Sequence, residues 1–429
     1  MTIREQLALH GGTPVRARPY DSERGVNYLN EAEEMNAVTE VMQSRSPFRY
    51  YGPDLKRRTE AFENRFKEML GVRYALGISS GTAALQAGLV GLGVEDGDEV
   101  IIPAVTFIAT PGAVVMARAV PVFAEVDDTL GLSPESFEAN ITEKTKAVIP
   151  VHLSNVACDM DRIMAVARKH GIKVLEDAAQ AIGVMYKGRQ VGTFGDAGAF
   201  SLQLSKNITT GEGGVLATND WSVFDRAARF QDQGGQFTTA HGDVRDASQV
   251  GATEDLVSGE PFYGTNMRMT EISGALAYAQ LGRLEEIVSA MRSRAQSIRQ
   301  RLSDLPVDWR RIPDPAGEGG NVTMFFQDAE IATKFAEALR AEGIPAGRVY
   351  GGRPVYQNPA VLERRTAWTK GCPFNCAEHP TDRTYHLGMC PRSEDLLARS
   401  LTIQLGALMT DQDTEDVVRA VRKVAEHLL

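Results

Sequence analysis

A single lysine, Lys206, lies between hydroxyl residues and a glycine cluster in the stretch FSLQLSKNITTGEGG, which spans residues 200–214. The usual place of a lysine is a solvated surface loop, which needs no such surroundings. A lysine that loses its proton and attacks a carbonyl group does need a setting of this kind. We therefore take Lys206 as a candidate nucleophile, and Ser201, near the end of the preceding apolar run, as a candidate phosphate ligand.

Two further motifs follow earlier strand-like runs. In ISSGTAAL, residues 78–85, a strand ends and an Ala- and Leu-rich helix begins. The N–H groups of the first helical turn and the Thr82 hydroxyl can form an anion site, and Gly81 lets a phosphate approach the backbone. The commoner interpretation is a hydroxyl residue that caps the helix. In VLEDAAQAIG, residues 174–183, Asp177 follows an apolar strand, where it faces a cationic ligand nitrogen or caps the next helix.

The chain order of these motifs indicates one cofactor. A dinucleotide site would also place an acid after a strand, but no G-x-G-x-x-G motif occurs at the earlier strand-to-helix turns. A phosphate cradle, an acid, a hydroxyl and then a lysine match the demands of pyridoxal 5'-phosphate. That cofactor needs its phosphate anchored, its ring nitrogen kept protonated by a carboxylate, and its aldehyde held by a lysine. The sequence therefore predicts pyridoxal phosphate as the cofactor.

Apolar runs that alternate with helical stretches must position these residues. Seven strands are predicted between residues 74 and 218, from the segments YALGISS, DEVIIPA, VPVFAEV, KAVIPVHL, IKVLEDA, GAFSLQ and GGVLAT. Such alternation predicts a mostly parallel sheet covered on both faces, with the ligand beyond the carboxyl ends of the strands. The polar stretch 231–260 predicts a long loop, and helical periodicity from about Met269 predicts one or two long helices.

Composition limits the classes of protein that fit. The formal net charge of −10 over 429 residues argues against nucleic-acid or anionic-membrane partners, and no run is long enough for a membrane span. The N-terminus lacks a long apolar segment, and four cysteines do not make a disulfide scaffold, so we expect a cytoplasmic protein. Three cysteines and two histidines lie close together, but not in a zinc-finger spacing; we expect ordinary thiols and no metal at Cys372, Cys376, His379, His386 and Cys390.

Several longer segments, in order, resemble a known family. These are SSGTAALQAGL, DEVIIPAVTFIATPGAV, VPVFAEVD, EDAAQAIG, FSLQLSKNITTGEGG and YGTNMRMTEISGALAYAQL. They are similar to the DegT/DnrJ/EryC1/StrS sugar aminotransferases, which are fold-type I pyridoxal-phosphate enzymes, and the resemblance covers at least residues 49–286. It implies a mostly parallel seven-stranded sheet flanked by helices, with a smaller α+β C-terminal domain. We expect an N-terminal arm at 1–45, a large cofactor-binding domain at 46–305 and a small domain at 306–429.

The resemblance also implies roles for individual residues. Lys206 would form the Schiff base with the cofactor and shuttle the proton between carbons, and Asp177 would pair with the ring nitrogen. Gln180 would lie against one face of the ring, and Phe107 against the other, although a core aromatic is the alternative for Phe107. The phosphate ligands would be Gly81, Thr82 and Ser201.

One implied role crosses between subunits. Asn266 of YGTNMRM would reach the phosphate of the partner subunit, so that the enzyme is a homodimer with its sites at the interface. His152 would lie near the cofactor, and its role stays open.

The resemblance narrows the reaction but not the acceptor. A related branch has histidine in place of the lysine and acts as a dehydratase, so Lys206 favours transamination. We expect transfer of an amino group from L-glutamate or L-glutamine to a keto- or aldehyde-sugar or a cyclitol, in amino-sugar or antibiotic biosynthesis. The alternatives are a pyridoxal-phosphate-dependent elimination or oxidation, and a non-catalytic regulatory homologue. Aromatic residues in FRYYGP (48–53) and VYGGRPVYQN (349–358) suit a polyhydroxylated ligand or ordinary packing.

Overall fold

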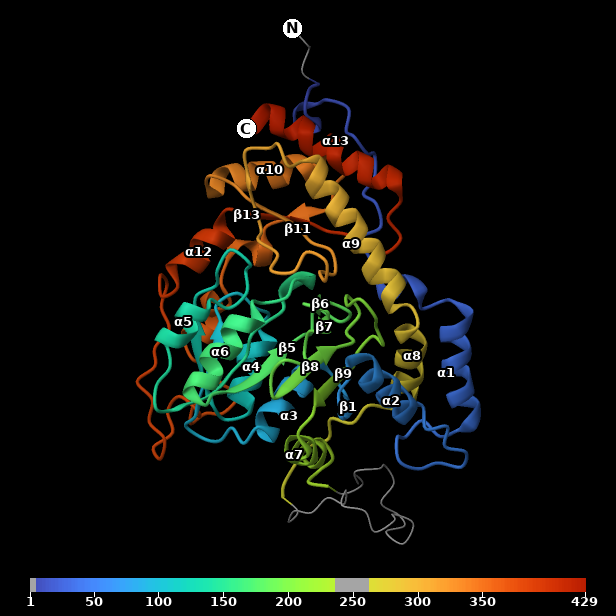
Figure 1. The fold of residues 1–429 in the computed structure, drawn as a ribbon, viewed down its shortest axis with the longest axis vertical. Coiled ribbons are helices and arrows are strands. Elements are labelled where there is room, and N and C mark those ends of the chain that lie inside the picture. Colours follow the sequence, from blue (N-terminus) through green and yellow to red (C-terminus); the bar gives the residue numbers. More distant parts are fainter. Residues whose placement is uncertain (1–4, 236–261) are drawn as a thin grey trace.

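Seven strands form the central sheet of this computed structural model, which describes residues 5–235 and 262–429 (Figure 1). Most of the predicted long loop at 231–260 lies outside the described residues. All seven predicted strands are confirmed. They are β1 (Tyr74–Ile78), β2 (Glu99–Pro103), β3 (Val120–Ala124), β4 (Thr145–Val148), β5 (Lys173–Asp177), β8 (Ala197–Ser201) and β9 (Gly214–Thr218).

The order of the strands brings their carboxyl ends together. The sheet runs β1-β9-β8-β5-β4-β2-β3. Neighbouring strands are parallel except at β9, which is antiparallel to both β1 and β8. The six other strands therefore end at one edge, where parallel sheets bind their ligands. The mostly parallel α/β fold expected from the alternation of strands and helices is confirmed.

Side chains that alternate along each strand build two cores, one on each face of the sheet. In β2, Ile101 packs into one core, and its neighbours Val100 and Ile102 pack into the other. One face is covered by α3 (Gly81–Gly91), α4 (Ala109–Met116) and α7 (Trp221–Gln231). The other is covered by α2 (Arg58–Leu70), α5 (Pro134–Ala139), α6 (Met160–His170), α8 (Glu271–Leu281) and α9 (Leu284–Arg301). The two helices α8 and α9 confirm the periodicity that begins near Met269.

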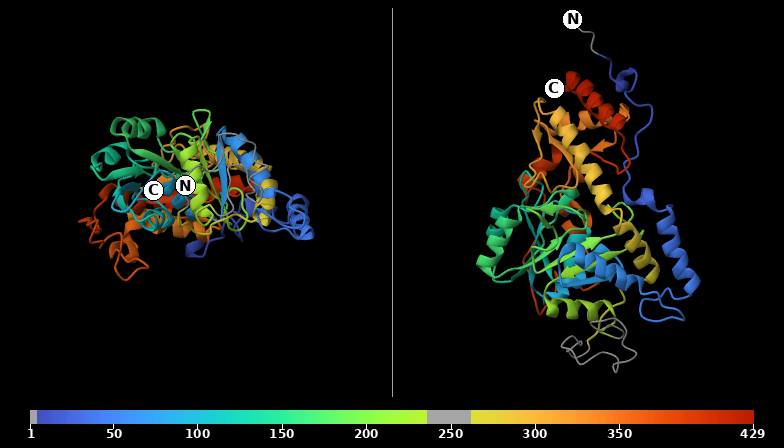
Figure 2. Two further views of the ribbon diagram at one scale, coloured as in Figure 1. Left: turned by 90° about the horizontal axis from the view of Figure 1, so that it is seen from below. Right: turned by 45° about the vertical axis from the view of Figure 1, so that its right-hand side comes forward.

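A second, smaller sheet lies toward the end that holds both termini (Figure 1). Its four strands are all antiparallel, in the order β10 (Asp308–Trp309), β11 (Val322–Phe325), β13 (Ser400–Ile403) and β12 (Ala346–Gly347). The α-helices that follow α9 in the chain are α10 (Ala329–Ala341), α11 (Pro359–Leu362), α12 (Pro391–Ala398) and α13 (Asp411–Leu428). The strands β6 (Met185–Tyr186) and β7 (Arg189–Gln190) form a separate two-stranded sheet. Figure 2 shows α9 running from this smaller part toward α8.

The N-terminal arm first contacts the part of the molecule that contains the small sheet. The backbone N–H groups of Ala8 and Val15 donate to the Glu342 carboxylate, at 2.8 and 2.9 Å. The Tyr20 hydroxyl donates to the carbonyl of Gln404 at 2.7 Å. The arm then continues into α1 (Ala32–Ser44), which packs on α8. The domain boundaries at 45 and 305 stay a prediction.

The cysteine-rich segment differs from the expectation. Cys372 and Cys376 are joined in a disulfide, so the expectation of ordinary thiols is wrong for these two residues. They lie four positions apart in one loop, close enough for their sulfurs to meet. Cys390 has a buried thiol. Across the described parts of the chain, no cluster of three or more potential metal ligands occurs, and no helix is long and apolar enough to cross a membrane.

Candidate active site

A cavity of about 570 Å³ opens beyond the carboxyl ends of the parallel strands. Seven of the residues predicted for the site line it together, although they come from distant parts of the chain: Gly81, Thr82, Phe107, Asp177, Gln180, Ser201 and Lys206. Thr110 and Tyr350 complete its walls near these residues. The eighth predicted residue, Asn266, does not line this cavity.

One corner of the cavity is the N-terminus of α3. The Ser80 hydroxyl caps this helix by accepting the N–H of Ala83 at 3.1 Å, so the capping interpretation holds for Ser80 rather than for Thr82. Gly81 lies directly against β8, because a Cβ atom added to it would be 2.7 Å from the Cβ of Ser201. This corner therefore combines backbone N–H groups with two hydroxyls, a donor set that suits an anion.

Asp177 is a buried carboxylate at the end of β5. It accepts the N–H of Ala179 at 3.1 Å and the hydroxyl of Thr110 at 2.9 Å. Burial raises the pKa of Asp177, whereas these two donors and the charge of Lys206 oppose that rise. No α-helix begins in residues 178–196, so the helix-cap interpretation of Asp177 is wrong.

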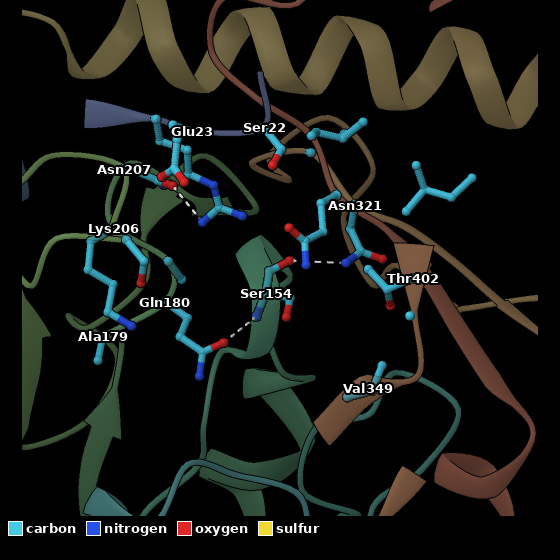
Figure 3. A pocket seen from close by; sticks show the side chains of 18 of the residues that line it. Ser22, Glu23, Ser154, Ala179, Gln180, Lys206, Asn207, Asn321, Val349 and Thr402 are labelled. Carbon is cyan, nitrogen blue, oxygen red and sulfur yellow. Dashed lines mark hydrogen bonds between the residues drawn. The ribbon is translucent and has the colours of Figure 1, made fainter. Parts of the chain in front are cut away.

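Lys206 lies in the loop between β8 and β9, where its N–H donates to the carbonyl of Gln203 at 2.9 Å. Burial lowers the pKa of its ammonium group; the carboxylate of Asp177 opposes this effect, and the guanidinium of Arg24 adds to it. A lowered pKa increases the fraction of neutral amine, which is the nucleophilic form of lysine. Lys206 points into the same space as the side chain of Gln180 in Figure 3.

The amide of Gln180 is held from two sides. Its carbonyl oxygen accepts the N–H of Ser154 at 3.3 Å (Figure 3). Its NH₂ group donates to the Tyr350 hydroxyl at 2.9 Å. Burial raises the pKa of Tyr350 to about 12, so this hydroxyl stays protonated at neutral pH. Tyr350 belongs to a stretch that the sequence singled out for ligand contact, whereas Tyr356 of the same stretch is buried in the core.

Phe107 and Asn266 lie at the margins of this subunit. Phe107 is 57% exposed beside the cavity, so the alternative of a core aromatic is wrong. Asn266 forms a bridge with Asp232, and its side-chain oxygen accepts the N–H of Arg268 at 3.4 Å.

His152 and Glu176 are fully buried behind the site. The Nδ1 atom of His152 accepts the N–H of Cys158 at 3.1 Å, so its hydrogen is on Nε2, which lies 2.9 Å from the Glu176 carboxylate. The same carboxylate accepts three backbone N–H groups, from Gly192, Phe194 and Gly195. The N–H of His152 also donates to the carbonyl of Asp177 at 3.0 Å. The pair therefore fixes the backbone that carries Asp177.

A second cavity, of about 380 Å³, adjoins the first and shares Lys206, Gln180 and Tyr350 with it. It reaches the N-terminal arm at residues 22–24, and the end of β13 with the two residues that follow it, at 402–405. Figure 3 shows Glu23, Asn207 and Lys206 on one side and Asn321 and Thr402 on the other. Sequence reasoning missed the arm's contribution, since no motif marks these residues.

A known protein family matches most of the chain. The DegT/DnrJ/EryC1/StrS aminotransferase family matches residues 29–387. The chain belongs to this family. The prediction of an enzyme of the aminotransferase class is therefore confirmed, as is the resemblance from which the family was expected.

Relatives within the family cover most of the chain. An L-glutamine:2-deoxy-scyllo-inosose aminotransferase of Streptomyces kanamyceticus is 33% identical over 438 residues, 98% of this chain and 97% of its own. A GDP-perosamine synthase of Escherichia coli O157:H7 is 39% identical over 306 residues, 71% of this chain and 79% of its own.

Solved structures of the family share the fold. DesV of S. venezuelae, in complex with a ketimine intermediate, superposes with a TM-score of 0.79 at 28% identity, over 97% of this chain and 100% of that one. DesI in the presence of its TDP-sugar product has a TM-score of 0.76 at 25% identity, over 99% and 96%. The fold-type prediction, a large mostly parallel sheet with a smaller domain, is thus confirmed.

Proposed function

We propose that this family member is a pyridoxal-phosphate-dependent aminotransferase that moves the amino group of L-glutamate or L-glutamine to the keto or aldehyde group of a sugar or cyclitol. The observation that carries the proposal is the shared cavity of Lys206, a buried carboxylate and the N-terminus of α3. Nucleophile, acid and anion site meet there in a space of about 570 Å³.

The residues present fit the cofactor. A phosphate group suits the corner at Gly81, where a Cβ atom would occupy the approach to Ser201. The buried Asp177 suits a protonated ring nitrogen, because an opposite charge offsets the cost of burying its carboxylate. Lys206, with its lowered pKa, suits an aldehyde. When bound, pyridoxal phosphate supplies the electron sink that makes the α-hydrogen of an amino acid acidic.

The chain's own residues divide the remaining work. Thr82 and Ser201 would hold the phosphate of the cofactor, and Phe107 and Gln180 would contact its ring. Asp177 keeps a proton on the ring nitrogen through its negative charge. Lys206 would hold the cofactor through its aldehyde carbon, and its neutral Nζ, once free, would move the α-proton of the donor.

The names of the relatives support a sugar or cyclitol as the acceptor. One relative is named for 2-deoxy-scyllo-inosose and another for perosamine, and DesI was solved with a TDP-sugar. The second cavity has a polar lining that suits hydroxyl groups or a polar donor, with Ser154, Asn207, Asn321 and Thr402 among its residues.

The proposal extends to a homodimer. Asn266 lies outside both cavities of its own subunit. This position is consistent with the role that the family resemblance implies, which is contact with the phosphate site of the partner subunit. A cytoplasmic location stays a prediction.

The test begins with the cofactor and ends with the acceptor. The purified protein should absorb in the visible range, and borohydride should fix the cofactor on the peptide that carries Lys206; labelling on another peptide would contradict the proposal. L-Glutamate or L-glutamine should then convert the bound cofactor to its amine form, which keto-sugars, an aldehyde sugar acid or scyllo-inosose should reverse. Release of ammonia from an amino acid or amino-sugar, without that conversion, would indicate elimination or oxidation instead.

A further inference from the structure

Arg24 brings a positive charge from the N-terminal arm to the wall of the second cavity. The four charged residues of that wall are Glu23, Arg24, Lys206 and Arg348, three of them basic. Arg348 already donates to the carbonyl of Ala398 at 3.3 Å. The cavity therefore has an excess of positive charge on the side where the arm meets the lysine loop.

The arm is fixed closely against that loop. Gly25 leaves no room for a side chain, since a Cβ atom would lie 2.8 Å from the carbonyl oxygen of Asn207 and 2.7 Å from the side-chain oxygen of Gln280. Asn207 directly follows Lys206 in the chain. Its side-chain oxygen accepts a hydrogen bond from the guanidinium of Arg24 at 3.4 Å, which Figure 3 marks with a dashed line at Asn207. These two residues are 183 positions apart, so tertiary packing alone places Arg24 beside the lysine.

The guanidinium of Arg24 lacks a matching anion. Among residues 5–235 and 262–429, the long contact to Asn207 is its one hydrogen bond, and no carboxylate lies within 4 Å. A guanidinium has five N–H donors in a planar fork that matches a carboxylate. Burial lowers the pKa of Arg24, and the nearby charge of Glu23 only partly opposes that effect. A ligand anion would supply the missing partner.

We infer that Arg24 binds the α-carboxylate of the amino donor. The inference rests on the proposed transamination. The donor nitrogen must reach the place that Lys206 Nζ leaves, and an α-carboxylate is bonded to the same carbon as that nitrogen, so its oxygens lie within roughly 3–4 Å of it. Arg24 lies near this place, because it lines the same cavity as Lys206 and its guanidinium contacts Asn207, the residue that follows the lysine. A phosphate or carboxylate on a sugar acceptor would lie several bonds farther away.

Binding without turnover provides the test. The α-methyl derivatives of L-glutamate and L-glutamine have no α-hydrogen, so they bind to the cofactor-loaded protein without transferring their amino group. Their dissociation constants are measured by calorimetric and absorbance titration for the wild type, Arg24→Leu and Arg24→Lys. Arg18→Leu is the matched control, since Arg18 is an exposed arginine of the same arm.

Arg24→Leu should raise the dissociation constant of the bound derivative about 10- to 100-fold, the usual effect of losing a charged hydrogen-bond partner. Arg24→Lys should recover part of the affinity, and Arg18→Leu should change nothing. 4-Aminobutyrate, which lacks the α-carboxylate, should bind the wild type and Arg24→Leu equally.

The possible failures are distinguishable. If the wild type and Arg24→Leu bind a derivative equally well, the role of Arg24 is overturned and the proposed transamination stands. The same holds if Arg24→Leu weakens the binding of the acceptor and not that of the derivative. If the wild type neither binds a derivative nor converts its cofactor with either amino acid, the proposed function is refuted and this inference with it. The thermal midpoint and cofactor spectrum of each variant show whether a loss of affinity comes from unfolding.

Discussion

Replacing Asp177 with asparagine separates the charge of this residue from its place in the fold. Asparagine has the same shape, and its side-chain oxygen can keep the N–H of Ala179. Its NH₂ group can donate to the Thr110 hydroxyl, which then turns to donate to Thr106, 2.6 Å away. Both hydrogen bonds of the side chain are retained, and only the bond with Thr110 reverses its direction, so the free energy of unfolding should change by no more than about 1 kcal/mol.

The pH dependence of this change has a definite sign. Burial raises the pKa of Asp177 in the folded, cofactor-free protein, so its ionised form costs stability as pH rises. The cofactor-free Asp177→Asn protein should therefore be at least as stable as the wild type at pH 7. Its advantage should shrink as pH falls through the raised pKa of the wild-type carboxyl. Thermal midpoints of the two cofactor-free proteins across this pH range measure the effect.

The reaction should respond very differently. Asparagine cannot supply the negative charge that keeps a ring nitrogen protonated, and removal of one such electrostatic contact in an active site costs about 3–4 kcal/mol, or roughly 10²- to 10³-fold in rate. A single-turnover experiment mixes the cofactor-loaded protein with L-glutamate or L-glutamine and follows the loss of cofactor absorbance. A rate for Asp177→Asn within about tenfold of the wild type would refute the role given to this carboxylate.

Three other substitutions test the site and its support. Gly81→Ala should lower the affinity for pyridoxal phosphate about tenfold or more, because the new Cβ would lie 2.7 Å from the Cβ of Ser201. An unchanged affinity would show that this corner is not the phosphate site. Glu176→Gln should lower the free energy of unfolding by about 2 kcal/mol or more, because the NH₂ group of glutamine cannot accept the backbone N–H groups that the carboxylate now accepts. Urea titrations measure this loss, and a loss below about 0.5 kcal/mol would contradict the prediction. Mixed Lys206→Ala and Asn266→Ala proteins should regain activity, as one hybrid site has both residues; no recovery after demonstrated subunit exchange would argue against shared sites.

The sequence predicted the elements whose signals are local. Each buried strand is a short apolar run between turn residues, and the alternation of these runs with helical stretches located all seven. The motifs at Gly81, Asp177 and Lys206 follow strands of one parallel sheet, and this topology brings them to one cavity. The choice between a ligand contact and a helix cap at Asp177 needed coordinates, because both interpretations place an acid after a strand.

Other parts of the site depend on packing that no pattern records. Arg24 is one of several arginines in a polar arm, and only the contact between Gly25 and the lysine loop reveals its position. Tyr350 and Tyr356 are close neighbours in one stretch, yet the first lines both cavities and the second is fully buried. The Cys372–Cys376 disulfide was likewise unexpected, since two cysteines four residues apart fit a thiol loop equally well.

The pairing of β1 with β9 has a consequence for how the protein is made. Ile78 lies opposite Gly214, so the strand that leads into the α3 corner must wait for a partner formed much later in synthesis. Contacts between such distant segments are slow to form, because the chain entropy lost in closing the loop precedes the stabilisation gained. A nascent chain that ends before residue 214 has the lysine but lacks the strand that inserts between β8 and β1. Cofactor capture should therefore mark the completion of the large sheet during folding, and chains stalled before that point should stay open to chaperones and proteases.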